Sequence, residues 1–153
     1  MTTSLEPVRR TQTFAAVSPA AVYQVVTDFE AYPRVFKEIS SARVVERQGS
    51  RVRAEFRLPM MLPVRYVLDL VCDESALRVD WTFVEGDVVT DNQGGWRFSA
   101  LGADTQVDYH VSLSVKAPVP GFVLRKITDG LVSASLPGMF RALEAEVRQR
   151  TRA

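Results

Sequence analysis

Apolar and polar residues alternate one by one through most of the middle of the chain, from residue 39 to about residue 115. A repeat of two is typical of antiparallel strands with one buried face and one exposed face. Short polar links interrupt the alternation, and with a further segment near residues 10–17 they predict a sheet of about seven strands. In the later runs the apolar phase contains Tyr66, Leu68, Trp81, Phe83, Trp96, Phe98 and Tyr109.

Two short helices are predicted after the first strand. Ser18 is a suitable N-cap, and Pro19 fits the first helical position, where its missing N–H leaves no hydrogen bond unmade. Residues 20–29 then place apolar side chains on one helical face. The Tyr32-Pro33 pair ends this helix, because a residue before proline avoids the helical conformation, and a second short turn follows.

The end of the chain has the spacing of a helix. Apolar residues recur there every three or four positions, and the residues in this pattern are Leu124, Ile127, Leu131, Leu136, Met139, Phe140, Leu143 and Val147. Pro137-Gly138 interrupts the pattern, which predicts a kink or two abutting helices at that point. A helix of roughly 25 residues is the only predicted element long enough to cover the dry face of the sheet.

These elements predict a single α+β domain over residues 1–153, with a curved antiparallel sheet around the C-terminal helix. A strongly bent sheet cannot touch a helix along its whole length, and the gap between them is a natural ligand cavity. Trp81 and Trp96 are the best candidates for its wall, and Tyr66 and Tyr109 for hydrogen bonds to a ligand. The helical side of the cavity is expected to consist of Leu124, Ile127 and Leu131.

Charge and composition argue against several classes of function. The chain has 19 Lys and Arg residues and 18 Asp and Glu residues, and a net charge of +1 gives no electrostatic reason to expect a nucleic acid partner. One cysteine, Cys72, excludes a disulfide framework, and one histidine, His110, falls in the polar phase of its strand. Gly94-Gly95 precedes a strand, which indicates a β-bulge or a sheet bend rather than a phosphate loop. We therefore expect no metal and no cofactor.

The N-terminal segment does not have the pattern of a signal peptide. Residues 1–10 contain Arg9 and Arg10, but no apolar run follows them. No other stretch approaches the ~20 apolar residues that a membrane span requires. These observations predict a cytoplasmic protein.

Several segments resemble a known family. They are SPAAVY at residues 18–23, DFEAYP at 28–33, WTFVEG at 81–86, GGWRF at 94–98 and the strand at 105–109. Together they resemble the polyketide cyclase/dehydrase and coenzyme Q-binding (START-like) family, in order and over nearly the whole chain. The resemblance implies a helix-grip fold, in which the sheet wraps around the last helix. It indicates function less specifically, because lipid carriers, quinone binders and aromatases share such folds.

The apolar phase of the sheet favours binding over chemistry. An enzyme needs at least one positioned proton donor or acceptor, whereas the predicted cavity wall is aromatic and aliphatic with few ionisable groups. We therefore expect a protein that binds or carries a lipid, an isoprenoid quinone or a polyketide-like aromatic. The alternative is a polyketide cyclase or dehydratase that folds a flexible substrate and uses Tyr66 or Tyr109 as a weak acid.

Two links are more apolar than surface loops usually are, at residues 58–63 and 118–122. One interpretation is that they pack on each other or on the helix. The other is a flexible rim around the cavity mouth, which would admit a ligand or make transient contact with a membrane or a partner. The residues of this predicted rim are Met60, Met61, Leu62, Val119 and Phe122.

Overall fold

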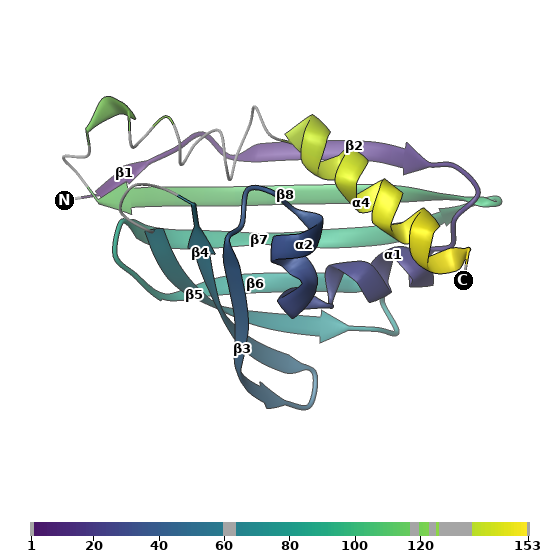
Figure 1. The fold of residues 1–153 in the computed structure, drawn as a ribbon, viewed down its shortest axis with the longest axis horizontal. Helices are drawn as coiled ribbons and strands as arrows, with labels where there is room; N and C mark the ends of the chain where they lie inside the picture. Colours follow the sequence, from purple (N-terminus) through teal and green to yellow (C-terminus); the bar gives the residue numbers. More distant parts are fainter. Residues whose placement is uncertain (1, 60–63, 117–119, 123–124, 126–135, 153) are drawn as a thin grey trace.

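The computed structural model describes residues 2–59, 64–116, 120–122, 125 and 136–152. Within these residues one antiparallel sheet of eight strands curves around three helices. Figure 1 shows the helices α1 (Pro19–Val26), α2 (Tyr32–Val35) and α4 (Leu136–Thr151) on the same face of the sheet. This is the helix-grip arrangement that the sequence resemblance implies.

The strands follow one another in space almost as they do in the chain. They are β1 (Thr2–Ser4), β2 (Val8–Phe14), β3 (Ser41–Gln48), β4 (Arg51–Leu58), β5 (Val64–Asp73), β6 (Arg78–Gly86), β7 (Val89–Leu101) and β8 (Asp104–Lys116). Their order is β1-β8-β7-β6-β5-β4-β3, and β2 also pairs with β8. The first two strands thus share the outer edge of β8, and the other six form a meander.

The sheet has one strand more than the alternation predicted. The additional strand, β1, is three residues long and exposed throughout, so it contains no alternation that could reveal it. The pairing shifts register at Val44/Glu46, at Val67/Leu68 and at Val89/Asp91. Of the bulge or sheet bend predicted at Gly94-Gly95, the bulge is wrong, because β7 pairs with β8 without a shift from residue 91 to residue 101, and the bend stays a prediction. Gly94 instead allows the ring of Trp81 to pack closely on the strand.

Two short helices form where the sequence predicts them, but the expectation that Tyr32-Pro33 ends the first one is wrong. The first helix already ends at Val26, and Tyr32, with helical φ and ψ of −54° and −41°, begins α2 with Pro33 in its first turn, a position that proline tolerates. The side chain of Ser18 caps α1 by accepting a hydrogen bond from the backbone N–H of Ala21 at 3.2 Å, and Pro19 occupies the first turn. The helix ends at Val26, and the short 3₁₀ segment η1 (Phe29–Ala31) leads directly into α2. These turns carry the chain across the open end of the sheet before β3 begins.

Helix α4 packs its apolar stripe on the dry face of the sheet. Phe140, Leu143 and Val147 are completely buried along it. Pro137 and Gly138 are the second and third residues of the described part of α4, and the chain before Leu136 lies outside the described residues, so the kink or the two abutting helices expected at Pro137-Gly138 stay a prediction. The expected helix of roughly 25 residues is therefore described only for its last 16 residues. The predicted wall residues Leu124, Ile127 and Leu131 lie outside the described residues.

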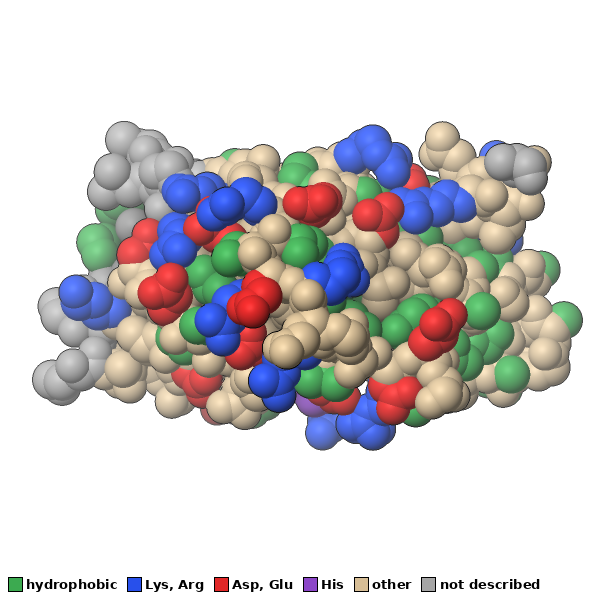
Figure 2. Space-filling view, turned by 90° about the horizontal axis from the view of Figure 1, so that it is seen from below, with side chains coloured by type: hydrophobic (Ala, Val, Ile, Leu, Met, Phe, Trp, Pro, Cys, Tyr) green, Lys and Arg blue, Asp and Glu red, His purple; other side chains and the backbone are tan. Residues whose placement is uncertain are grey.

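The surface mixes charges of both signs. In Figure 2 basic and acidic side chains are interspersed on the face seen from below Figure 1. Many of them are paired across strands, as in the contact of 2.8 Å between Arg53 and Asp69. None of the described helices combines the length and the apolar character that crossing a membrane requires.

Candidate functional site

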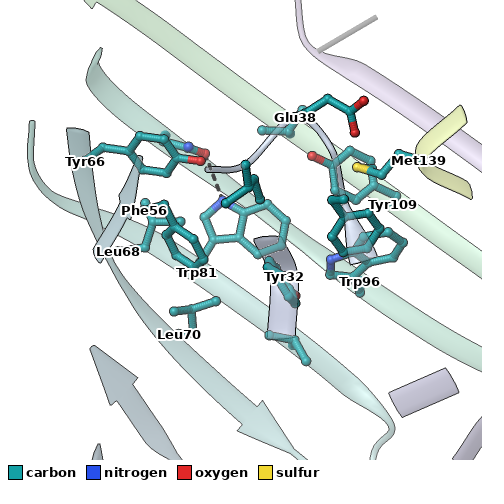
Figure 3. A pocket seen from close by; sticks show the side chains of 15 residues that line it. Tyr32, Glu38, Phe56, Tyr66, Leu68, Leu70, Trp81, Trp96, Tyr109 and Met139 are labelled. Carbon is teal, nitrogen blue, oxygen red and sulfur yellow. Dashed lines mark hydrogen bonds between the residues drawn. The ribbon is translucent and has the colours of Figure 1, made fainter. Parts of the chain in front are cut away.

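A cavity lies between the dry face of the sheet, the turn after α2 and the start of α4. Its volume is about 80 Å³. The described residues that line it are Tyr32, Phe36, Glu38, Ile39, Phe56, Tyr66, Leu68, Leu70, Val79, Trp81, Asn92, Trp96, Tyr109, Val111 and Met139. Figure 3 shows aromatic rings from the sheet facing the turn that carries Glu38. The wall is therefore mainly aromatic and aliphatic, with a few polar groups.

The alternation of the strands places most of this wall. Tyr66 and Leu68 lie on β5, Trp81 on β6, Trp96 on β7 and Tyr109 on β8, all in the buried phase. Neighbouring strands bring these side chains together because their inward residues stand opposite one another in the register. Both tryptophans of the chain consequently reach the same cavity.

Trp96 is the centre of an aromatic layer at the helical side of the cavity. Its ring centroid lies 4.5 Å from that of Tyr109, 5.6 Å from that of Phe140 on α4 and 6.1 Å from that of Phe98. Contacts of this kind add to the stabilisation that buried area alone provides. The layer thus links β7 and β8 to α4 through ring contacts.

Trp81 has a defined polar partner inside the cavity. Its indole Nε1–H donates to the Oδ1 of Asn92 at 2.9 Å. Both side chains are buried, with 8% and 4% of their surface exposed. The position of the indole depends on Gly94, because a Cβ there would lie 2.5 Å from the Trp81 ring. Gly94 thus makes room for the ring on the sheet.

The hydroxyls of Tyr66 and Tyr109 are the other polar groups on the sheet side. Among the described residues neither hydroxyl has a hydrogen-bond partner, in contrast to Tyr32, whose hydroxyl donates to the carbonyl of Val26 at 2.5 Å. Burial raises the pKa of both Tyr66 and Tyr109 well above the ordinary value. They keep their protons at neutral pH and act as neutral hydrogen-bonding groups.

Glu38 is the acidic side chain of the described lining. It is half-buried and lies in the turn between α2 and β3, where Phe36 and Ile39 also contribute to the wall. No Lys or Arg stands among the described lining residues. The cavity can therefore donate hydrogen bonds from neutral groups and accept them at Glu38, but it has no cation to hold an anionic group.

Of the seven sheet residues predicted to line the cavity, five line it in the structure and two lie outside its lining. The five are Tyr66, Leu68, Trp81, Trp96 and Tyr109. Phe98 is buried beyond Trp96, where its ring meets that of Tyr23 on α1 at 6.5 Å. Phe83 lies on β6 beyond Trp81, which is the last residue of β6 that pairs with β7, and its ring is next to Gly86. Whether the five residues bind a ligand stays a prediction.

The predicted rim is described at one residue only. Phe122 is 62% exposed. Met60, Met61, Leu62 and Val119 lie outside the described residues, so the rim remains a prediction.

Ten residues of the described lining were not predicted from the sequence, and they fall into three groups. Phe56, Leu70, Val79 and Val111 share the apolar phase of their strands and could have been included by that signal. Asn92 stands two positions before Gly94 in the inward phase of β7, but a lone polar residue gave no reason to choose it. The other five lie in helices or turns, where no alternation marks them; they are Tyr32, Phe36, Glu38, Ile39 and Met139.

The remaining candidate chemistry lies away from the cavity. His110 stands on the outer face of β8, opposite Arg9 on β2 and Gly95 on β7. Partial burial, together with the charges of Arg9 and Arg97, lowers its pKa. Cys72 is half-buried at the end of β5. Within the described part of the chain, no group of three or more His, Cys, Asp or Glu residues is placed to hold a metal ion.

Comparisons with solved structures identify the same fold in other proteins. A protein from Thermus thermophilus is 27% identical, with a TM-score of 0.80 over 95% of this chain and 99% of that chain. The Zhui aromatase/cyclase from a Streptomyces species is 17% identical, with a TM-score of 0.82 over 97% of this chain and 96% of that one. At this identity the second likeness concerns the fold alone.

Sequence comparisons add a family and a relative. A protein from Streptomyces halstedii named "Putative polyketide cyclase" is 49% identical over 39 residues, which are 26% of this chain and 34% of the relative. The match thus spans about a third of that protein's length. The family model described as "Polyketide cyclase / dehydrase and lipid transport" matches residues 15–140. The chain therefore belongs to the polyketide cyclase / dehydrase and lipid transport family.

Proposed function

We propose that the chain binds one hydrophobic small molecule in the cavity between the sheet, the turn after α2 and α4. The candidates are a lipid, an isoprenoid quinone and a polyketide-like aromatic. One observation carries the proposal: both tryptophans and the side chains of Tyr66 and Tyr109 meet in one mainly apolar cavity, and neither tyrosine hydroxyl has a hydrogen-bond partner among the described residues. Buried hydroxyls need hydrogen bonds, and a bound molecule or water provides them.

The size of the cavity adds a condition to this function. Its 80 Å³ is well below the roughly 300–1,000 Å³ of sites that hold drug-sized ligands. A ligand of that size has to displace part of the wall. The sheet side of the cavity resists displacement because the strands β5, β6, β7 and β8 are each paired on both sides. The turn after α2 and the start of α4 are the parts of the described wall that can move.

A second candidate function is a cyclase or dehydratase reaction on a substrate held in the same cavity. Glu38 favours it, because its carboxylate lines the cavity and can accept a proton. The name of the Streptomyces halstedii relative points in the same direction. The raised pKa of Tyr66 and Tyr109 argues against it, since these hydroxyls are poor acids at neutral pH. We therefore place binding first.

The binding proposal is tested with the chain's own tryptophans. Because both line the cavity, intrinsic fluorescence reports on its occupancy without a label. Titration with 1,4-naphthoquinone should quench the emission and saturate at one molecule per chain. Native mass spectrometry of the freshly purified protein should show an extractable hydrophobic molecule, or one added naphthoquinone after incubation.

Two variants make the test specific. Trp96→Ala should weaken binding at least tenfold, because it removes the centre of the aromatic layer. Leu101→Ser, which changes an exposed apolar residue at the end of β7, should bind as the wild type does. Unsaturable quenching, or equal loss in both variants, would refute the proposal. Turnover of an offered polyketide analogue that Glu38→Gln abolishes would favour the enzyme instead.

A further inference from the structure

Asn92 holds its side-chain amide in one orientation. An indole N–H can only donate a hydrogen bond, so the atom of Asn92 that receives the bond from Trp81 at 2.9 Å has to be Oδ1. The Nδ2 group, with two donor hydrogens, is then on the other side of the amide. Figure 3 shows this bond running from the indole toward the side of the cavity where Tyr66 lies.

The amide nitrogen has no acceptor within the described residues. Asn92 lines the cavity and only 4% of its surface is exposed, so its free donors are available to a molecule in the cavity. The tyrosine hydroxyls of the lining also keep their protons, since burial raises their pKa. The sheet side of the cavity therefore presents donors that lack an acceptor among the described residues.

The charge of the lining restricts which acceptor fits. A carboxylate or phosphate needs a cation or several strong donors when it leaves water. No Lys or Arg lines the described wall, and the lining contains an acidic side chain, Glu38. An anionic ligand would be repelled there, whereas a neutral carbonyl oxygen accepts from an amide without that cost.

We infer that Asn92 is the residue that selects the ligand, and that it donates from Nδ2 to a neutral ring carbonyl, as in an aromatic ketone or a quinone. The ring of the ligand then lies among Trp81, Trp96 and the tyrosines, and Trp81 keeps the amide turned toward it. This inference rests on the proposed binding function. It separates ring ketones from fatty acids and phospholipids, whose charged heads the cavity does not accommodate.

The experiment compares 1,4-naphthoquinone with naphthalene, which has the same rings without the oxygens. Replacing Asn92 alone would leave the indole N–H of Trp81 unpaired, so the pair of variants is Trp81→Phe and Trp81→Phe/Asn92→Leu. Both lack the indole bond, and they differ only in the amide. Trp96 remains as the fluorescence reporter in both. Circular dichroism checks that each variant is folded.

The amide should matter for one ligand only. From the single to the double variant the Kd for naphthoquinone should rise at least tenfold, while that for naphthalene should change less than twofold. In the wild type the infrared carbonyl stretch of bound naphthoquinone should shift as expected for a hydrogen bond, and this shift should be absent in the double variant.

Other outcomes separate this inference from the binding function. If both ligands bind and both lose affinity equally in the double variant, Asn92 only supports the fold, and the inference is overturned. Tighter wild-type binding of oleate than of naphthoquinone would overturn it as well, since the cavity then accepts an anion. If no ligand binds the wild type, the binding function itself has failed. The ligand comparison in the wild type holds even if the double variant does not fold.

Discussion

At the scale of single residues, the cavity depends on a glycine as much as on its aromatic rings. A Cβ at Gly94 would meet the carbonyl oxygen of His110 and the ring of Trp81, the latter at 2.5 Å. The first neighbour is backbone of the paired strand β8 and cannot turn aside. A side chain at this position would therefore move Trp81 and break its bond to Asn92.

Gly94→Ala should lower the free energy of unfolding by about 2–3 kcal/mol, as overpacking in a closed interior does. Chemical denaturation followed by circular dichroism measures this loss, and the emission maximum of tryptophan should shift because Trp81 moves. Gly138→Ala is the matched control, since the nearest atom to its Cβ is the Arg141 side chain at 3.6 Å. A Gly94→Ala protein as stable as the control would contradict this account of Trp81.

The tyrosines make a second prediction at this scale. Burial raises the pKa of all four, Tyr23, Tyr32, Tyr66 and Tyr109, above the ordinary value near 10. A raised pKa in the folded state means that stability is complete below pH ~10 and falls as the pH rises above it. Alkaline unfolding should therefore begin near pH 10.

Absorbance at 295 nm, which follows tyrosinate, should rise together with the loss of the circular dichroism signal and not before it. The Tyr66→Phe/Tyr109→Phe protein should unfold at a higher pH than the wild type. Tyrosinate formation in a protein that is still folded at pH 10 would show that these hydroxyls are accessible to solvent.

At the scale of elements, a chain of four charged side chains joins α4 to α2 and to the turn after α1. Arg34 of α2 donates from both Nη atoms to the two oxygens of Glu146 at 3.0 and 2.8 Å. Arg150 donates from Nε to Glu146 at 2.8 Å and from Nη2 to Asp28 at 3.0 Å. Since α2 leads into the turn with Glu38, we expect this network to hold that part of the cavity wall in place.

Glu146 gives the network a pH dependence. The hydrogen bonds from Arg34 and Arg150 lower the pKa of this carboxyl to about 2, although burial alone would raise it. A lowered pKa in the folded state means that the stabilisation is present above the ordinary value near 4.5 and is lost as the pH falls toward 2. Between pH 5 and pH 2 the wild type should lose about 2 kcal/mol through this group.

Glu146→Gln should be less stable than the wild type by a similar amount at pH 7 and should lose less stability on acidification. Denaturant titrations between pH 3 and pH 7 measure both effects. Glu144→Gln is the control on the same helix, because its ion pair with Arg148 is partly exposed and should contribute less than about 0.5 kcal/mol. Parallel curves for wild type and Glu146→Gln would refute the role of the network.

Elements also show how far sequence reasoning reaches. Strands with strict alternation, such as β4 and β8, and the capped start of α1 could be predicted because each has a local physical signal. The strand β1 is too short to show a period, so the sequence could not reveal it. In the cavity the apolar residues of the sheet side were predictable by phase. Glu38 was not, because it lies in a turn, and Asn92 was not chosen because a lone polar residue in the inward phase of β7 gave no reason to choose it.

At the scale of the whole molecule, the sheet and the helices have different parts in the proposed function. Each strand from β4 to β8 is held by neighbours on both sides, so the sheet moves as one body. The elements opposite it are short: η1 has three residues, α2 has four, and the network of Glu146 joins them to α4. If the proposed function is right, we expect a ligand larger than 80 Å³ to enter by shifting this side.

Amide hydrogen exchange, measured with and without 1,4-naphthoquinone, tests whether the helical side moves while the sheet stays fixed. Binding should change the exchange of residues 29–39 and 136–151, because these segments have to move and repack around the ligand. The inner strands β6 and β7 should change little, since their hydrogen bonds remain intact, and the distant turn at Gln48 to Arg51 serves as an internal control. The Glu146→Gln protein, with its wall less firmly held, should take up the ligand faster in stopped-flow quenching. Exchange changes confined to β6 and β7 would mean that the sheet opens instead, and the helical side would then be the fixed wall.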